Sequence, residues 1–243
     1  MISIIIPTLN EEGEIERTLQ YLKECKENCE LDIEVIVSDG GSTDKTILIA
    51  KKYADHVVVY EGKERQTISG GKNLGATRAT GEHLLFIDAD VRIPEAHTTI
   101  VKIVKEIERD ETHLGATAFL MVRPEDATLT DKLIFGFMNY FSIFVNNVMN
   151  SGGAPGEFMM IRHKTFKELG GFREDLPVGE DWDLFRRMVK IGKARTYSGA
   201  TIFHSGRRAH KIGWPKLLWH WFVNNVYVIL FNKSAHKEWT PYR

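Results

Sequence analysis

The chain has 243 residues, of which 43% are hydrophobic and 27% are charged. This composition is ordinary for a globular protein and excludes wholesale disorder, a collagen-like repeat and a small disulfide framework. The two cysteines, Cys25 and Cys29, lie four residues apart in one predicted helix with no histidine nearby. We therefore expect free thiols in a reduced compartment, and neither a disulfide nor a metal site. The first residues, MISIIIP, resemble a strand, and we expect no signal peptide.

The net charge of −1 conceals two regions of opposite sign. Residues 1–183 contain 20 Lys and Arg against 32 Asp and Glu, whereas residues 184–237 contain 11 basic and no acidic side chains. A basic, acid-free segment of this length indicates contact with something anionic. Phosphate groups, a membrane surface and nucleic acid all carry a suitable charge. No nucleic-acid-binding module is recognisable in the sequence, so we expect no nucleic-acid partner.

Short apolar segments alternate with helical patterns through the first half of the chain. Strands are expected at 3–6, 34–37, 57–60 and 83–87. Helices are expected at 11–28, after an N-cap at Ser42 or Thr43, at 70–80, and from Ile93-Pro94-Glu95 onward. This alternation predicts an α/β fold with a mainly parallel, Rossmann-like sheet that is covered by helices on both faces.

The second half is less regular. Strands are expected at 114–122 and 157–161, and helices at 163–169 and 180–191. Two further helical segments, 133–149 and 214–231, are strongly apolar, and the first of them is expected to lie in the core. The sequence shows no internal repeat and no linker, so one compact domain followed by a C-terminal extension is the simplest interpretation.

Polar side chains follow three of the predicted strands, at the point where each strand ends. Thr8 and Glu11 follow the first strand, Asp39 ends the second, and Asp88 and Asp90 follow the fourth. Ligands of parallel sheets bind at the carboxyl ends of strands. Single residues of these types usually form turns and caps, but three such strand ends favour a site. The Asp-Ala-Asp spacing suits a hard divalent cation that also binds phosphate oxygens.

Several motifs, in this order, resemble family 2 glycosyltransferases. They are IIIPTLNEE at 4–12, VIVSDGGSTDKT at 35–46, GGKNLGATRATGE at 70–82, LLFIDAD at 84–90, Gly153-Ala154-Pro155-Gly156, and Gly179-Glu180-Asp181. The resemblance runs from about residue 2 to residue 206. It implies a GT-A domain over residues 1–206, with a nucleotide-binding half at 1–110 and an acceptor half at 111–206, followed by a basic, aromatic extension at 207–243.

The resemblance implies transfer of a sugar from a nucleotide diphosphate donor, linked to UDP or GDP, with inversion at the anomeric carbon. It implies a donor site that comprises Pro7, Thr8, Glu11 near the ribose, Asp39 at the base, Lys72, Asp88 and Ala89. It also implies that Asp90 binds the Mg2+ or Mn2+ that bridges the diphosphate, and that His204 supplies a further metal or phosphate ligand. Such an ion neutralises the charge that develops on the leaving diphosphate. No GxxxxGK[ST] motif is present to bind phosphate instead.

On the acceptor side, the resemblance implies that Asp181 is the general base and that Gly156, Glu180 and Arg207 contact the acceptor or its phosphate. Inversion requires a base on the face of the sugar opposite the leaving group. A phosphate acceptor needs little deprotonation, so Asp181 would matter less for it. Acidic residues at 180–183 would also stabilise the start of a helix, which leaves Glu180 and Asp183 undecided. No QxxRW follows, and we therefore expect transfer of one sugar rather than polymerisation.

Segment 214–231 has 13 apolar residues in 18, with Lys216, His220 and Asn224 along one stripe. With basic residues on either side of its start, this pattern favours an interfacial membrane helix whose Trp side chains, Trp214, Trp219 and Trp221, lie at the headgroups. Only 15 uncharged residues follow Lys216, fewer than the ~20 that span a bilayer. We expect a peripheral protein on the cytoplasmic face of the cell membrane, with a sugar or a lipid-linked phosphate as acceptor.

Two alternatives to a glycosyltransferase remain at this point. A nucleotidyltransferase also uses an α/β nucleotide domain, but its glycine-rich N-terminal motif is missing because the first strand leads into PTLNEE. A non-catalytic nucleotide- or lipid-binding module would not need Asp39, Asp88, Asp90 and Asp181 together.

Overall fold

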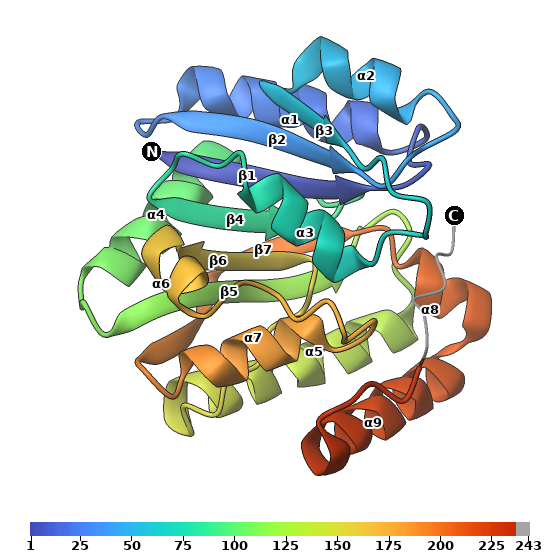
Figure 1. Cartoon of the computed structure of the whole chain (residues 1–243). Coiled ribbons are helices and arrows are strands. Elements are labelled where there is room, and N and C mark those ends of the chain that lie inside the picture. Colours follow the sequence, from blue (N-terminus) through green and yellow to red (C-terminus); the bar gives the residue numbers. More distant parts are fainter. Residues whose placement is uncertain (237–243) are drawn as a thin grey trace.

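A computed structural model describes residues 1–236 of the chain. Its centre is a seven-stranded sheet with the order β3-β2-β1-β4-β6-β5-β7 (Figure 1). The strands are β1 (Ile2–Thr8), β2 (Ile33–Asp39), β3 (His56–Val59), β4 (His83–Ile87), β5 (His113–Val122), β6 (Phe158–Arg162) and β7 (Lys193–His204). β1 to β4 pair in parallel, as do β5 and β7, whereas β6 runs antiparallel between β4 and β5. The predicted mainly parallel sheet is confirmed.

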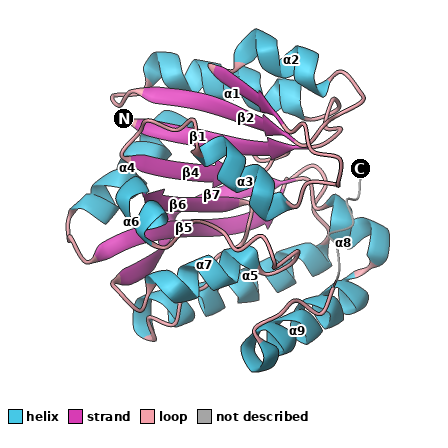
Figure 2. Ribbon diagram, viewed as in Figure 1, coloured by secondary structure: helices cyan, strands magenta, loops and turns pink. Residues whose placement is uncertain are grey.

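Helices cover both faces of the sheet (Figure 2). They are α1 (Ile15–Asn28), α2 (Thr46–Tyr53), α3 (Ile68–Ala76), α4 (Ala96–Glu108), α5 (Leu129–Ile143), the π-helical turn η1 (Phe144–Val148), α6 (His163–Glu168), α7 (Glu180–Met188), α8 (Arg207–Ile212) and α9 (Trp214–Phe231). One buried cluster joins α1 and α4 to the sheet, and a second joins α3, α6 and α7 to its other face. The fold is therefore the three-layered α/β arrangement that the sequence predicts.

The central strands are apolar throughout because both of their faces are buried. Successive side chains of a strand point to opposite faces. In β1, Ile4 and Ile6 belong to the cluster with α1 and α4, and Ile5 belongs to the other cluster. In β4, Leu85 and Phe86 divide between the clusters in the same way.

Two elements, β7 and α8, are not predicted from the sequence. The inner part of β7 is interrupted by the exposed residues Ser198 and Gly199, so no apolar alternation marks it as a strand.

The predicted N-cap at Ser42 or Thr43 is wrong, since α2 begins at Thr46. The Ser42 hydroxyl instead donates to Asp39, which keeps it in the preceding turn.

The chain leaves β1 for β2 and β3 on one side and returns to β4 on the other. Such a reversal of strand order opens a crevice at the carboxyl ends of the two central strands. Because β6 is antiparallel to β4, the start of β6 reaches the same edge as the end of β4. The end of β7 also lies there, since β7 is parallel to β5 and its residue Phe203 pairs with Arg92, which follows β4.

The apolar segment predicted at 133–149 forms α5 and η1, but the expectation of a core helix is wrong for its apolar side. Leu133, Phe137 and Tyr140 are exposed, whereas the polar residues Asn139 and Asn146 are buried. Helix α9 has the predicted bounds 214–231. Within residues 1–236, no helix is both long enough and apolar enough to cross a membrane.

Candidate functional site

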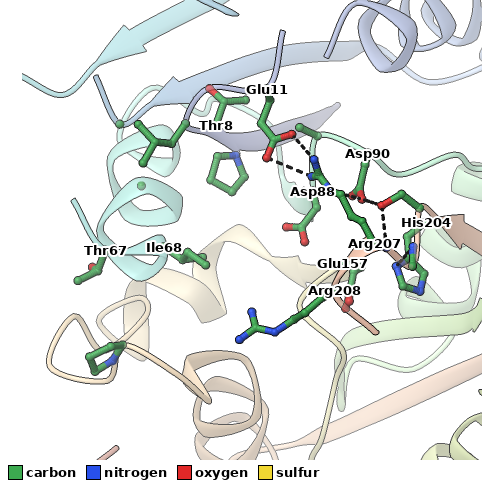
Figure 3. A pocket seen from close by; sticks show the side chains of 18 of the residues that line it. Thr8, Glu11, Thr67, Ile68, Asp88, Asp90, Glu157, His204, Arg207 and Arg208 are labelled. Carbon is green, nitrogen blue, oxygen red and sulfur yellow. Dashed lines mark hydrogen bonds and ion pairs between the residues drawn. The ribbon is translucent and has the colours of Figure 1, made fainter. Parts of the chain in front are cut away.

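A cleft of about 390 Å³ opens at the carboxyl ends of β1, β2 and β4 (Figure 3). Eight of the thirteen predicted site residues line it: Pro7, Thr8, Glu11, Asp88, Ala89, Asp90, His204 and Arg207. They come from the ends of β1, β4 and β7 and the start of α8. The other five, Asp39, Lys72, Gly156, Glu180 and Asp181, lie outside this lining.

Arg207 forms ion pairs with two carboxylates in the cleft (Figure 3). Its Nη1 lies 2.9 Å from Oε2 of Glu11, and its Nε lies 3.3 Å from Oδ2 of Asp90. Burial would lower the pKa of Arg207, but the hydrogen bond to Glu11 and the charge of Asp90 outweigh burial and raise it. The Ser205 hydroxyl also donates to Asp90. A cation is thus already stabilised between these carboxylates.

The loop that carries Asp88 and Asp90 is fixed from behind. The Thr18 hydroxyl of α1 donates to the carbonyl of Ala89 at 2.6 Å. Arg123, which follows β5, donates from Nη2 to the carbonyl of Asp90 at 2.7 Å and to Glu14 at 2.6 Å. The bonds to Ala89 and Asp90 hold the backbone of the loop, and the Asp88 and Asp90 side chains line the cleft (Figure 3).

The residues at the end of β7 and β4 fit a divalent cation that arrives with a phosphate ligand. Nε2 of His204 is buried and has no hydrogen-bond partner among the described residues. Residues 1–236 contain no cluster of three or more His, Cys, Asp or Glu side chains that could hold a metal by themselves. Mg2+ commonly binds through one or two carboxylates together with substrate phosphates, and Asp90 supplies one such carboxylate, bonded to Ser205, the residue after His204.

Asp39 lies behind the wall of the cleft and is fully buried. Its Oδ1 accepts from the N–H groups of Gly41 and Ser42, and its Oδ2 accepts from the hydroxyl groups of Ser42 and Thr8. In this structure the Asp39 carboxylate therefore fixes the β2 turn against the end of β1. Its contact with a base stays a prediction.

A second group of charged residues lies next to the cleft. Lys72 of α3 is buried, and its Nζ lies 3.0 Å from Oε1 of Glu180 and 5.1 Å from the ring centre of Phe172. Helix α3 approaches β1 closely because Gly75 has no Cβ, which would lie 2.5 Å from Ile5 Cγ2. The Thr67 side chain caps α3 by accepting from the N–H of Gly70 at 3.0 Å.

Asp181 belongs to the same group as Lys72 and Glu180. It lies in the first turn of α7, and its Oδ1 accepts from the N–H of Trp182 at 2.8 Å. A Cβ added to Gly156 would be 3.3 Å from Oδ2 of Asp181 and 3.5 Å from Nζ of Lys72. The structure thus brings Gly156, Lys72, Glu180 and Asp181 together. Asp183, in contrast, pairs with Arg187 at 2.7 Å, an arrangement within the helix.

Burial and like charges shift the proton affinities of this group. Burial, followed by the charge of Glu180, raises the pKa of Asp181 to about 7, although Lys72 opposes the shift. Burial and the charge of Glu157 raise the pKa of Asp88 well above its usual range. Burial would lower the pKa of Lys72, but Glu180, Asp88 and Asp181 raise it. A carboxyl group with a pKa near 7 is suited to accept a proton in neutral solution.

Sequence reasoning missed some residues that line the cleft. Glu157 enters it at the start of β6, and its neighbour Gly156 already belonged to a motif, which could have identified it. Ser205 had no recognisable pattern, whereas Phe135 was expected in a core helix and Leu217 and Trp221 in a membrane helix, and all three line the cleft. Trp214, expected at a membrane surface, is buried in the same lining, and its Nε1 donates to Oδ1 of Asp131 at 2.7 Å. That expectation is wrong because a capping-box carboxylate of α5 receives the indole N–H.

The comparison with known families gives one match, the model described as Glycosyl transferase family 2, over residues 3–170. That range covers more than half of the chain and contains most of the cleft. The chain therefore belongs to glycosyl transferase family 2.

Among curated proteins, the chain is similar to an uncharacterized glycosyltransferase from Haemophilus influenzae, with 24% identity over 85% of this chain and 70% of the relative. It is 36% identical to a PGL/p-HBAD biosynthesis glycosyltransferase from Mycobacterium bovis, over 40% of this chain and 38% of the relative. It is 26% identical to the succinoglycan biosynthesis protein ExoA of Rhizobium meliloti, over 78% of this chain and 58% of the relative. The chain thus spans less than two thirds of the last two relatives.

Solved structures share the fold. A mannosyltransferase from Pyrobaculum calidifontis, in complex with GDP-Man and Mn2+, superposes with a TM-score of 0.65 at 24% identity, over 84% of this chain and 56% of that one. Glucosyl-3-phosphoglycerate synthase from Mycobacterium tuberculosis, in complex with Mn2+, UDP and phosphoglyceric acid, gives 0.62 at 19% identity, over 95% and 77%. Together with the sheet order, these likenesses confirm the GT-A fold that the motifs imply.

Proposed function

We propose that this chain transfers one sugar, with inversion, from a nucleotide diphosphate donor to an acceptor, and that the reaction requires Mg2+ or Mn2+. The observation that carries the proposal is the position of Asp181. This carboxyl group has a pKa of about 7 and lies with Lys72 and Glu180 beside a cleft that contains Asp88 and Asp90. Membership of the family indicates the class of reaction. Within the site, Asp88 and Asp90 would bind the metal and the diphosphate, and Asp181 would accept the proton.

The donor would lie across the ends of β1 and β4. Pro7, Thr8 and Glu11 would contact the nucleoside, and Asp88 with Ala89 would contact the ribose and diphosphate. Asp90 and His204 would hold the divalent ion, which when bound neutralises negative charge on the diphosphate. Arg207 now occupies the space between Glu11 and Asp90, and binding of a donor would redirect its guanidinium towards phosphate oxygens.

On the acceptor side, an acceptor hydroxyl oxygen would form the new bond to the anomeric carbon as the bond from that carbon to the diphosphate oxygen breaks. Asp181 would take the hydroxyl proton. Lys72 keeps part of the Asp181 population ionised, because it opposes the upward shift of the Asp181 pKa. Gly156 leaves room beside Asp181 Oδ2 for the reacting groups.

We propose a lipid-linked phosphate as the acceptor and a peripheral position at the cytoplasmic membrane face. The support is chemical: part of the cleft lining is aromatic, from Phe135, Trp214 and Trp221, and Arg208 also lines the cleft. An apolar chain with an anionic head matches that combination of surfaces. A phosphate acceptor would make Asp181 less important than a hydroxyl acceptor would.

Thermal unfolding with UDP, GDP and their sugar conjugates, with and without Mn2+, tests donor binding. The proposal predicts that at least one diphosphate raises the unfolding temperature, and that the increase is larger with the metal. If neither UDP nor GDP changes it under any condition, donor binding and the proposed transfer are both wrong.

A further inference from the structure

Helices α5 and α9 each turn a buried asparagine side chain towards the protein, although many of their apolar side chains point away from it. In α5, the buried Asn139 side chain bonds to both the N–H and the carbonyl of Leu120 in β5. In η1, Asn146 bonds in the same way to Gly153. In α9, the buried Asn224 donates to the carbonyl of Val178 at 3.0 Å. A helix in water normally has the reverse arrangement.

Exposed apolar side chains concentrate on these two helices. Of the 18 large hydrophobic side chains that are exposed within residues 1–236, 15 lie between 129 and 149 or between 218 and 231. On α5 and η1 they recur at helical spacing: Leu129, Leu133, Phe137, Tyr140, Phe144 and Val148. On α9 they include Trp219, Phe222 and Leu230. Exposed apolar patches of this extent mark an interaction surface.

The two helices are connected at their N-terminal ends. The rings of Phe135 and Trp214 are 5.4 Å apart, and Asp131 accepts hydrogen bonds from Trp214 and pairs with His210 of α8. Both helices lie along the same lower side of the molecule in Figure 1, below the sheet and away from α2. The starts of the two helices are therefore adjacent, and both helices lie on the side of the molecule away from α2.

The charges of this region suit an anionic surface. Residues 132–156 and 184–237 contain no Asp or Glu, and together they contain 12 Lys and Arg. On the helices themselves, Lys132 and Lys216 are exposed, whereas Asp131, the one acidic residue of α5, η1 and α9, is buried. The acidic side chains of the chain lie elsewhere, so nothing in these segments repels anionic headgroups. Apolar side chains that insert into a membrane boundary, flanked by basic residues, are the features of a peripheral membrane-binding surface.

The same helices also reach the cleft. Phe135 of α5 and Trp214, Leu217 and Trp221 at the start of α9 form its apolar wall. The two helices therefore carry both the apolar wall of the cleft and the exposed apolar side chains. A molecule held at the exposed surface would have its polar head next to the cleft.

We propose that α5, η1 and α9 together form one docking surface for an anionic lipid bilayer, in which the exposed apolar side chains of both helices insert. This surface gives the peripheral membrane position proposed above its residues, and the link to a lipid-linked acceptor rests on the proposed transfer; bilayer binding itself does not require sugar transfer. Sequence reasoning placed membrane contact in the 214–231 segment alone. The structure adds α5 and η1, and excludes Trp214 from the contact.

The test is flotation of the full chain with phosphatidylcholine vesicles and with vesicles that also contain phosphatidylglycerol. Phe137→Glu on α5 and Phe222→Glu on α9 each replace a side chain that is more than 60% exposed, so the fold should survive. Leu48→Glu on α2 is a matched control, because Leu48 is 71% exposed and α2 packs beside β3, at the edge of the sheet far from β5 and α5. Circular dichroism verifies folding, and Leu133→Glu and Trp219→Glu replace any variant that fails to fold.

We expect the wild type and Leu48→Glu to bind the anionic vesicles equally. Each variant on α5 or α9 should lower the partition coefficient by at least about tenfold, the effect of removing one buried Phe side chain. The proposal is wrong if the wild type binds neither kind of vesicle. It is also wrong if only the α9 variant loses binding, since one helix would then suffice.

Two further measurements separate this proposal from the proposed transfer and from self-association. Asp181→Asn should bind vesicles like the wild type, and Phe137→Glu should hydrolyse a nucleotide sugar in lipid-free solution like the wild type. If the wild type hydrolyses a nucleotide sugar but binds neither kind of vesicle, only the docking surface is wrong and the proposed transfer stands. If sedimentation velocity shows a dimer that Phe137→Glu dissociates, while vesicles do not bind, the surface contacts a second copy of this chain.

Discussion

The cleft and the neighbouring Lys72–Glu180–Asp181 group contain the same kinds of side chain but differ in how the negative charge of their carboxyl groups is compensated. In the cleft, Asp90 is held by Arg207 and Ser205, so its negative charge is compensated by cations and hydroxyl groups. Asp181 lies near one cation but also near Glu180, and burial raises its pKa to about 7. Because of this difference, we expect mutations of Asp90 to affect metal and diphosphate binding, and mutations of Asp181 to affect proton transfer.

The largest expected effect is that of Asp90→Ala, which removes a carboxylate from the proposed metal site. We expect turnover to fall by about 10³-fold or more, since loss of a metal ligand removes several kcal/mol of charge stabilisation. Stabilisation by nucleoside diphosphate should also lose its dependence on Mn2+. Asp126→Ala, an exposed carboxylate outside the cleft, is the control and should behave as the wild type. Metal-dependent turnover by the Asp90 variant would show that the ion binds elsewhere.

Asp181→Asn should affect only proton transfer. With a hydroxyl acceptor, we expect transfer to slow by ~10²–10⁴-fold, the usual cost of removing a general base. Binding of the donor, measured by thermal shift, should stay within about twofold of the wild type. Asp175→Asn changes an exposed carboxylate near the start of α7 and should leave transfer unaffected. Wild-type turnover in the Asp181 variant would mean a phosphate acceptor or a different base.

Lys72→Met tests the connection between the two halves of the chain, because Lys72 belongs to α3 and its partner Glu180 to α7. Removing one member of a buried ion pair typically costs ~3–5 kcal/mol, so we expect a clear fall in the free energy of unfolding. Lys72 also opposes the rise of the Asp181 pKa, so the acidic limb of the rate profile should move to higher pH. If the unfolding free energy and the rate profile both match the wild type, the pair does not couple to Asp181.

The pH dependence of the wild type follows from the pKa of Asp181. The rate constant kcat/KM for a hydroxyl acceptor should fall as the pH drops through about 7, because the protonated base cannot accept a proton. A raised pKa means that folding favours protonated Asp181, so its ionisation costs stability as the pH rises from about 4 to about 7. Asp181→Asn should therefore be more stable than the wild type at pH 8, with a smaller difference at pH 4. Urea denaturation at both values measures this difference.

Much of the donor side could be predicted from the sequence because it follows the strands. Apolar runs define β1, β2 and β4, and the residues after them, Thr8, Asp88 and Asp90, must meet at one edge of a parallel sheet. The polar interruption of β7 gave no such information. Glu157 depends on the antiparallel direction of β6, which a five-residue apolar strand does not reveal.

For the apolar helices α5 and α9, the sequence predicted the helices but not which of their sides faces the protein. The segment 133–149 has the periodicity of an amphipathic helix, and periodicity defines two sides without saying which one faces the sheet. Asn139 faces inward because it satisfies both backbone groups of Leu120, a contact between residues 19 positions apart that no local pattern predicts. The same reasoning explains Trp214, whose partner Asp131 lies 83 positions away.

The most direct test of the central claim is release of nucleoside diphosphate from a panel of UDP- and GDP-sugars by the full chain, with Mn2+, with Mg2+ and with a chelator. The account predicts that the wild type cleaves at least one nucleotide sugar and that the chelator stops this reaction. It also predicts that the Asp90→Ala variant cleaves none, even when metal is added. Cleavage of a nucleotide sugar at the same rate in the chelator, or by Asp90→Ala, would contradict the account.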